Sequence, residues 1–123
     1  MRATPKQSSS IRLKRIYVQP SPDDGLRILV DRLWPRGISK EWACLTCWMP
    51  DLAPSTALRQ WFQHDSQKWS EFVRCYHAEL QSQEEGIRFI RHQAERLVVT
   101  MLYAARQEHL SHATALKAYV LHG

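Results

Sequence analysis

The chain is organised around residues 27–37, Arg-Ile-Leu-Val-Asp-Arg-Leu-Trp-Pro-Arg-Gly, where an apolar segment runs into a charged one. Residues 27–33 favour a β-strand, and the Pro-Arg-Gly sequence at 35–37 breaks it. In α/β proteins, ligands bind where the chain leaves the carboxyl ends of the strands. We therefore expect the loop after this strand to carry the functional site.

The composition is that of a single globular domain. The chain has 123 residues, of which 44% are hydrophobic and 24% charged, and this is enough to bury one core. No apolar segment approaches the roughly 20 residues of a membrane-spanning helix, and the N-terminus lacks the apolar centre of a secretory signal. Three cysteines are an odd number, and a domain of this size folds without disulfides. These features favour a cytoplasmic protein with no membrane partner.

The net charge of +5 comes from the N-terminal part of the chain. Five of the 17 basic residues precede the first acidic residue, Asp23, and the remaining basic residues balance the 12 acidic ones. We expect residues 1–10, which are polar and rich in serine, to form a disordered basic arm, and residues 11–123 to form the folded domain. The charge allows two interpretations: a solvated tail, or an arm that follows nucleic-acid phosphates together with the basic residues at 12–15.

The order of the predicted elements indicates an α/β fold. Strands are expected at residues 11–18, 27–33 and 97–104, the last of them apolar without alternation and therefore buried on both faces. The predicted helices cover about residues 40–48, 84–95 and three segments that begin near residues 55, 65 and 111. The first two strands are joined too briefly for a helical crossover, so they are antiparallel if adjacent and otherwise not neighbours. A long helical crossover joins the second and third strands, which makes them parallel.

Several sequence motifs resemble the YeaO-like branch of the domain-of-unknown-function family four-eight-eight. These motifs are VDRLWPRG followed by SKE, then DLAPS, LR, WF, H and KW, and MLYAA…HA at the far end. The resemblance covers about residues 11–121 and implies a small Rossmann-like α/β domain, without implying a reaction. The chain departs from the branch at Ser111, where Asn is usual, and near Thr46 and Cys47, where acidic residues are usual. Of a Cys-His-Arg sequence at the last helix of the broader family, it keeps only His112.

Basic residues near the strand end are candidates for binding an anion, because guanidinium groups fit phosphate and carboxylate well. These candidates are Arg32, Arg36, Lys40 and Arg59. Alternatively, Arg32 pairs internally with a carboxylate such as Asp31 or Asp51. Trp34 either packs in the core or forms a wall against a planar ligand.

Two residues at the start of the last predicted helix complete the candidate site. His112 has a side chain whose usual pKa suits proton transfer at neutral pH, and it is the candidate catalytic residue; the alternative is a packed histidine. Ser111 is a candidate ligand-binding residue, but it suits a helix cap better than a nucleophile paired with His112, because neighbouring helical residues point about 100° apart. We expect Ser111 or His112 to converge with Arg32 and Arg36 on one concavity at the carboxyl edge of the sheet.

Cys44 and Cys47 have the spacing of a redox pair or of half a zinc site. The predicted helix at 40–48 places them more than one turn after its start, and no further ligands follow at a standard spacing. We therefore expect neither a metal nor a cofactor.

The leading hypothesis from the sequence is an enzyme, or a descendant of one, that binds a phosphorylated or nucleotide-like small molecule at the strand ends. In this hypothesis Arg32, Arg36 and Arg59 hold the anion, Trp34 forms a wall and His112 handles protons. The alternative is a non-catalytic nucleic-acid-binding module that uses the same groove with the basic arm. A third possibility is an interaction domain with a vestigial site. Binding to several phosphates of a nucleic acid weakens steeply as salt rises, and this distinguishes the first two hypotheses.

Overall fold

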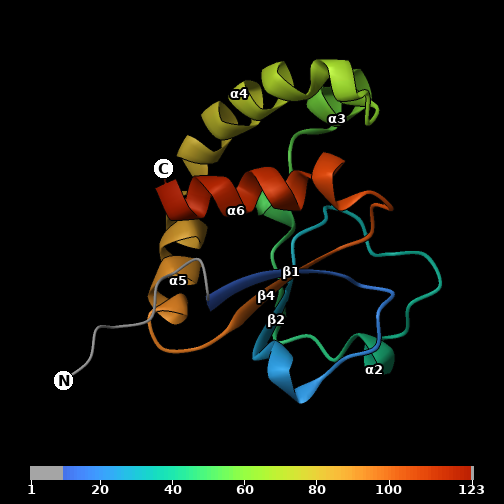
Figure 1. Ribbon diagram of the computed structural model, residues 1–123, viewed down its shortest axis with the longest axis vertical. Coiled ribbons are helices and arrows are strands. Elements are labelled where there is room, and N and C mark those ends of the chain that lie inside the picture. The colour runs from blue at the N-terminus through green and yellow to red at the C-terminus, as the bar shows by residue number, and fades with distance from the viewer. Residues whose placement is uncertain (1–9, 123) are drawn as a thin grey trace.

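The computed structural model describes residues 10–122, which form a four-stranded sheet flanked by helices (Figure 1). The strands are β1 (Ile11–Arg15), β2 (Leu26–Leu29), β3 (Cys47–Trp48) and β4 (Val99–Tyr103). Their order in the sheet is β1-β4-β2-β3, and every pairing is parallel. The predicted fold class, a small Rossmann-like α/β domain, is confirmed.

The central strand β4 lies between β1 and β2. Val99 of β4 is in register with Ile11 on one side and with Leu26 on the other. The first two strands are therefore not neighbours, and β2 and β4 are parallel, as the long crossover between them predicted. All five residues of β4 are buried, in agreement with its apolar sequence.

Five α-helices belong to the described part of the chain: α2 (Lys40–Ala43), α3 (Thr56–Phe62), α4 (Trp69–Leu80), α5 (Glu84–Ala94) and α6 (His112–His122). Helices α5 and α6 pack against the sheet, α4 packs on α6, and α3 packs on α4. Figure 1 shows α3 and α4 farthest from the sheet, with α6 between them and the strands. Short 3-10 helices occur at residues 22–24, 50–52, 66–68, 81–83 and 108–110.

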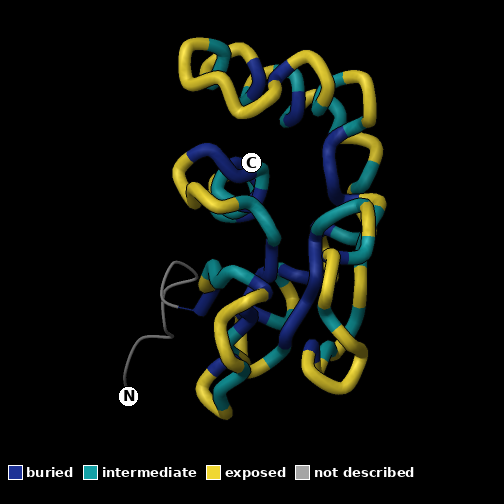
Figure 2. The backbone as a smooth tube through the Cα atoms, turned by 90° about the vertical axis from the view of Figure 1, so that its right-hand side faces the viewer, coloured by how far each residue is buried: buried dark blue, intermediate teal, exposed yellow. Residues whose placement is uncertain are grey.

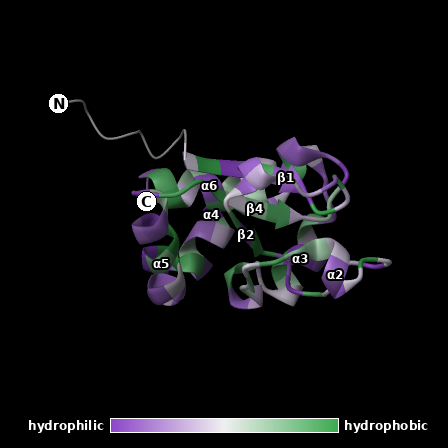
Figure 3. Cartoon of the chain, turned by 90° about the horizontal axis from the view of Figure 1, so that it is seen from below, coloured by the Kyte–Doolittle hydropathy of each residue, from purple (hydrophilic) through white to green (hydrophobic). Residues whose placement is uncertain are grey.

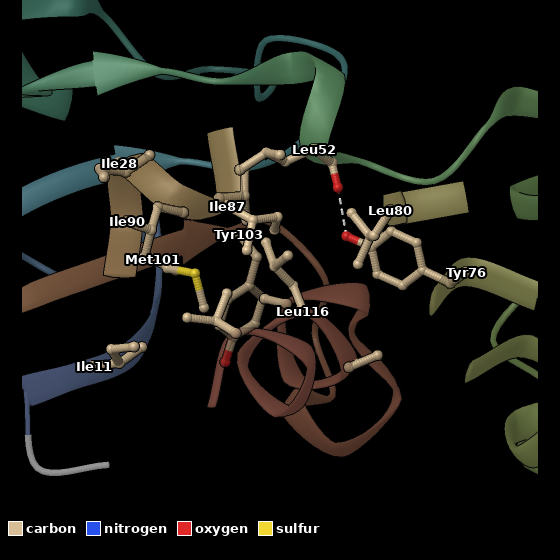
Figure 4. Packing of buried hydrophobic residues seen from close by; sticks show 14 of the residues in the cluster. Ile11, Ile28, Leu52, Tyr76, Leu80, Ile87, Ile90, Met101, Tyr103 and Leu116 are labelled. Carbon is tan, nitrogen blue, oxygen red and sulfur yellow. Dashed lines mark hydrogen bonds between the residues drawn. The ribbon is translucent and has the colours of Figure 1, made fainter. Parts of the chain in front are cut away.

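The main core lies between the sheet and the helices α4, α5 and α6. Figure 2 shows the buried stretches running through the sheet, and Figure 3 shows the hydrophobic stretches in the middle of the molecule. Leu52 joins this core, where its carbonyl accepts a hydrogen bond from the hydroxyl of Tyr76 (Figure 4). Other buried members are Ile11, Ile28, Leu80, Ile87, Ile90, Met101, Tyr103 and Leu116.

The opposite face of the sheet has a smaller core. Ile16, Leu29 and Leu102 are fully buried there together with Ala43 of α2. Trp34 and other partly buried side chains of the loop after β2 pack against them. This loop and α2 thus cover the second face of the sheet, in place of the longer helices that cover the first.

The predicted helix at 40–48 is wrong in its second half. α2 ends at Ala43, Cys44 has a left-handed backbone (φ 47°), and Cys47–Trp48 forms the edge strand β3. The buried side chain of Arg27 causes the break, because its Nε and Nη2 donate to the carbonyl of Ala43 at 3.0 and 2.8 Å. The chain then turns toward β2, where it pairs as a strand.

A buried cluster of charged side chains lies at the amino ends of β2 and β4. Asp24 accepts hydrogen bonds from Lys14 Nζ at 2.9 Å, from Arg27 Nη1 at 2.6 Å and from the backbone N–H of Ser21 at 3.0 Å. The carbonyl of Asp24 accepts from Thr100 Oγ1 at 2.7 Å. Asp24 and Arg27 are each 5% exposed, so this ion pair is shielded from solvent.

The predicted basic arm at residues 1–10 lies outside the described residues except for Ser10, which is buried. Within residues 10–122, no helix combines the length and the apolar character that a membrane span requires.

Candidate functional site

A cavity of about 670 Å³ lies where β2 and β4 end. Its walls come from the loop after β2, the loop after β4, the α3 region, α4 and the start of α6. The polar and charged side chains that face it include Asp31, Arg32, Arg59, His64, Arg106 and His112. The cavity lies at the edge of the sheet where the sequence led us to expect a site.

Asp31 and His112 form a close pair in the cavity wall. His112 Nε2 lies 3.5 Å from Asp31 Oδ1 and 2.9 Å from the carbonyl oxygen of Val30. Because a carbonyl only accepts hydrogen bonds, Nε2 carries a hydrogen and donates it to Val30. Asp31 Oδ2 accepts a hydrogen bond from the N–H of Ala104 at 3.1 Å. These bonds join the ends of β2 and β4 to the first residue of α6.

Burial shifts the pKa values of both members of this pair. Burial raises the pKa of the Asp31 carboxyl above its usual value, although the His112 ring, the Ala104 amide and Arg59 oppose the shift. Burial also lowers the pKa of His112, although Asp31 and the Val30 carbonyl oppose that shift. Both shifts favour the neutral forms of the two groups. His112 is therefore an uncharged ring at neutral pH, with its hydrogen on Nε2.

Arg59 reaches the cavity from α3, a helix whose start is well fixed. Ser55 Oγ accepts from the N–H of Leu58 at 3.1 Å, and Glu79 of α4 accepts from the N–H and hydroxyl of Ser55 at 2.8 and 2.7 Å. These bonds cap α3 and tie it to α4. The Nε atom of Arg59 is buried and has no hydrogen-bond partner within the described residues.

The charge on Asp31 can be tested by two substitutions. Asp31→Asn removes the charge and keeps an oxygen for the N–H of Ala104, so we expect a melting temperature equal to or above that of the wild type at about pH 7. A raised carboxyl pKa means that the folded state binds the proton more tightly, so the advantage of Asp31→Asn should grow as pH rises above about 4. Thermal unfolding across this pH range measures it.

The matched comparison is Asp31→Ala, which removes the acceptor for Ala104 as well. A buried N–H without a partner costs about 1–3 kcal/mol, so this variant should be less stable than the wild type. If Asp31→Asn were as unstable as Asp31→Ala, the negative charge itself would be stabilising and our account of the pair would be incorrect.

The sequence of the domain matches a protein family over almost its whole length. Residues 10–123 match the family described as the inactive DUF488-N3 subclade. The chain belongs to this family. Two of its relatives are the uncharacterized proteins Rv3073c of Mycobacterium tuberculosis and Mb3100c of Mycobacterium bovis, each 38% identical over 117 residues, which is 95% of this chain and 98% of theirs. The uncharacterized protein YeaO of Escherichia coli is 38% identical over 107 residues, or 87% of this chain and 93% of its own.

A comparison with solved structures gives no significant match.

In this DUF488-N3 domain, Arg32 has internal partners. Its Nη2 donates to the carbonyl of Ala53 at 3.0 Å, and its Nε donates to that of Pro54 at 3.3 Å. The partners are thus backbone carbonyls and not the carboxylates of Asp31 or Asp51 that we considered from the sequence. Arg32 lines the cavity and also fixes the segment that leads into α3.

Three other predicted residues lie outside the lining of the cavity. Trp34 Nε1 donates to the carbonyl of Ile38 at 2.7 Å, and its ring meets that of Trp48 edge to face at 5.5 Å. Arg36 and Lys40 are exposed on the loop and helix that cover the second face of the sheet. The structure brings Arg32, Arg59 and His112 together and leaves these three residues apart from them.

Ser111 is fully buried and has a structural role. Its Oγ accepts a hydrogen bond from the N–H of Ala113 at 3.0 Å, and its carbonyl accepts from Thr114 at 3.0 Å. It therefore caps α6, as the sequence favoured, and orients His112.

Sequence reasoning did not single out Asp31, His64 or Arg106 as members of a site. Asp31 was considered only as a partner for Arg32. A usable signal was present for two of these residues. Asp31 is the first charged residue after the apolar run that contains β2, and Arg106 is the first after the apolar run that contains β4.

The two cysteines of the Cys44–Cys47 pair differ in environment. Cys44 is exposed at the end of α2, and Cys47 is half-buried in β3, so the helical placement we predicted for them is wrong. Burial raises the pKa of the Cys47 thiol. No group of three or more His, Cys, Asp and Glu side chains within residues 10–122 is placed to hold a metal ion.

Proposed function

We propose that this domain binds a small phosphorylated or nucleotide-like anion in the cavity at the carboxyl ends of β2 and β4, as a non-catalytic descendant of an enzyme. The observation that supports it most is the guanidinium of Arg59, which lines the cavity and whose buried Nε has no hydrogen-bond partner among residues 10–122. A buried cationic donor without a partner is costly, and an anionic oxygen satisfies it.

The remaining charges of the cavity suit the same ligand. Arg32 and Arg106 add two guanidinium groups, whereas Asp31 is the one carboxylate among the residues that line it. This excess of positive charge attracts an anion. Arg106 is exposed and stands near solvent, where its long side chain can close over a bound phosphate.

The size and the apolar lining of the cavity suit an organic ligand. Its volume of about 670 Å³ is in the range of small-molecule sites. Apolar side chains line part of it, namely Leu33, Pro54, Phe62, Phe72 and Leu110. A phosphate ester with a sugar or a base uses both the cationic and the apolar part.

Binding without turnover agrees with three features of the chain. The matching family is described as an inactive subclade. Of the Cys-His-Arg sequence in the broader family, only His112 is present, and its Nε2 hydrogen is engaged by the carbonyl of Val30. The neighbouring hydroxyl of Ser111 is buried in a helix cap and does not line the cavity.

Calorimetric titration with AMP and with ribose 5-phosphate tests the proposed function. Arg59→Gln should weaken binding of these compounds about tenfold or more, because it removes a charge-assisted hydrogen bond inside the cavity. Arg96→Gln is the matched control, because Arg96 is exposed and does not line the cavity. A ligand at 100 times its Kd should also raise the free energy of unfolding by about 2.7 kcal/mol.

Two results would contradict the proposal. One is the absence of binding by any phosphorylated compound up to about 10 mM, a concentration that detects even Kd values in the millimolar range. The other is equal binding by Arg59→Gln and by the wild type, with both proteins folded.

The structure does not favour the alternative of a nucleic-acid-binding module. Lys14 pairs with Asp24, and the guanidinium of Arg15 donates to the carbonyls of Ala104 and Ala105 at 3.0 and 2.9 Å. Arg12 donates to the carbonyl of Asp23 at 3.3 Å. These side chains stabilise loops of the domain, so they do not form a free basic strip along β1.

A further inference from the structure

Two buried polar atoms of opposite character lack partners at the same cavity. Among the side-chain nitrogen and oxygen atoms that are buried in the described part of the chain, Arg59 Nε and Asp31 Oδ1 are the two without a hydrogen bond. Arg59 Nε–H is a donor, and an ionised carboxylate oxygen is an acceptor. Unpartnered buried polar groups are rare in folded proteins, and their meeting at one cavity points to a ligand.

The surrounding protein groups do not satisfy Asp31 Oδ1. His112 Nε2 is 3.5 Å away, but its single hydrogen is directed to Val30 at 2.9 Å. The N–H of Ala104 is used by the other oxygen, Oδ2. Residues 10–122 therefore leave Oδ1 without a donor, and a ligand in the cavity can supply one.

Arg59 and Asp31 do not satisfy each other either. No ion pair with an N···O distance of 4.0 Å or less joins these two described residues, although the charge of Arg59 opposes the rise in the pKa of Asp31. Both residues line the same cavity. A ligand that enters it meets a cationic donor and a carboxylate.

We propose that the ligand presents an anionic oxygen to Arg59 Nε and a hydroxyl group to Asp31 Oδ1, which makes it a hydroxylated phosphate ester such as a sugar phosphate. This inference rests on the proposed function and names its ligand class. A phosphate without a hydroxyl satisfies Arg59 but leaves Asp31 unpaired beside a second negative charge, which is unfavourable. A hydroxyl satisfies Asp31 and separates the two negative groups.

A pair of matched ligands tests this inference by calorimetry at about pH 8. Ribose 5-phosphate has the hydroxyls, and its 1,2,3-trideoxy analogue keeps the ring and the phosphate without them. The wild type should bind ribose 5-phosphate about tenfold or more tightly than the analogue, because a hydrogen bond to a charged group is lost with the hydroxyls.

Two variants assign this preference to residues. Asp31→Ala should bind both ligands with similar affinity, and it should bind the analogue at least as tightly as the wild type does, because the nearby negative charge is gone. Arg59→Gln should weaken both ligands by a similar factor and keep the preference. Circular dichroism of the unliganded variants confirms that each is folded before titration.

The outcomes separate the inference from the proposed function. Equal affinity of the wild type for the two ligands overturns the inference and leaves the proposed function in place. A preference that persists in Asp31→Ala also overturns it, because the hydroxyl then binds elsewhere. Failure of the wild type to bind either ligand overturns the proposed function, and the inference with it.

Discussion

Replacing Gly25 with alanine should prevent the domain from reaching its native structure at about 37 °C. Gly25 has φ 62° and ψ −128°, a backbone conformation that side chains with a Cβ rarely adopt. An added Cβ would lie 2.2 Å from the carbonyl oxygen of Val98. That oxygen accepts the N–H of Leu26 at 2.9 Å, so moving it away breaks the start of the β2–β4 pairing.

The strain and the overlap together should lower the free energy of unfolding by about 4 kcal/mol or more. Chemical denaturation followed by circular dichroism measures this change. Gly37→Ala is the control, because Gly37 also has a positive φ (79°) but has no atom within 4 Å of the added Cβ. It should cost only about 1–2 kcal/mol. Equal losses for the two variants would show that the contact with Val98 is unimportant.

Replacing Asp24 with alanine should have the second large effect, a loss of about 3–5 kcal/mol at pH 7. The change leaves the guanidinium of Arg27, which is 5% exposed, without its anionic partner. Removing one member of a buried ion pair is strongly destabilising because the other charge stays buried and uncompensated. Denaturation in urea at about pH 7 measures the loss.

The same carboxyl predicts a dependence on pH. Burial tends to raise the pKa of Asp24, but hydrogen bonds from Lys14, Ser21 and Arg27 outweigh it, and the pKa is lowered overall. The stability that Asp24 contributes is therefore present above its unfolded pKa of about 4 and is lost as pH falls through its folded pKa. The difference between the wild type and Asp24→Ala should shrink at about pH 3 or below.

Glu84→Ala is the matched control for this substitution. Glu84 pairs with Arg88 one turn along α5, and both side chains are more than two-thirds exposed, at 77% and 71%. Exposed pairs of this kind contribute about 0.3–0.5 kcal/mol. A loss as small for Asp24→Ala as for Glu84→Ala would show that the cluster at the amino ends of the strands is not stabilising.

Local sequence patterns predicted the helices and strands that are stabilised by nearby residues or by burial of apolar side chains. The apolar run at 97–104 marked the central strand β4, and the predicted helix that begins near residue 65 corresponds to α4, which buries Phe72, Tyr76 and Leu80. Ser55 and Ser111 were recognised as residues that start helices, and both accept the expected backbone hydrogen bond. The length of the crossover between β2 and β4 was enough to predict their parallel pairing.

Contacts between distant residues decided what the sequence did not predict. The helix at 40–48 stops at Ala43 because Arg27, 16 residues earlier, binds the carbonyl there. A run such as Leu45-Thr46-Cys47-Trp48 is compatible with a helix or a strand, and its pairing with β2 decides between them. No local signal reports such a long-range hydrogen bond.

The sequence predicted the edge of the sheet at which the cavity lies, but not which residues line it. The end of an apolar strand pointed to the edge of the sheet at which the cavity lies, but sequence proximity gave Arg36 and Lys40 the same weight as Arg32, which alone of the three lines the cavity. Only the folded chain shows that the loop after β2 turns to the second face of the sheet after Leu33. Asp31 was not predicted as a site residue, because a single carboxylate next to an arginine in sequence is usually interpreted as the ion-pair partner of that arginine.

The strand β1 lies at one edge of the sheet, and its charge affects whether two copies of the domain can pair along that edge. Among the described strands β1 pairs only with β4, so no other strand of residues 10–122 covers its outer side, where a strand of a second molecule can pair. Three of its five residues are basic, namely Arg12, Lys14 and Arg15. Lys14 pairs with Asp24, but Arg12 and Arg15 form no ion pair within residues 10–122. Two molecules joined along this edge would bring these two like charges together, which disfavours edge-to-edge pairing.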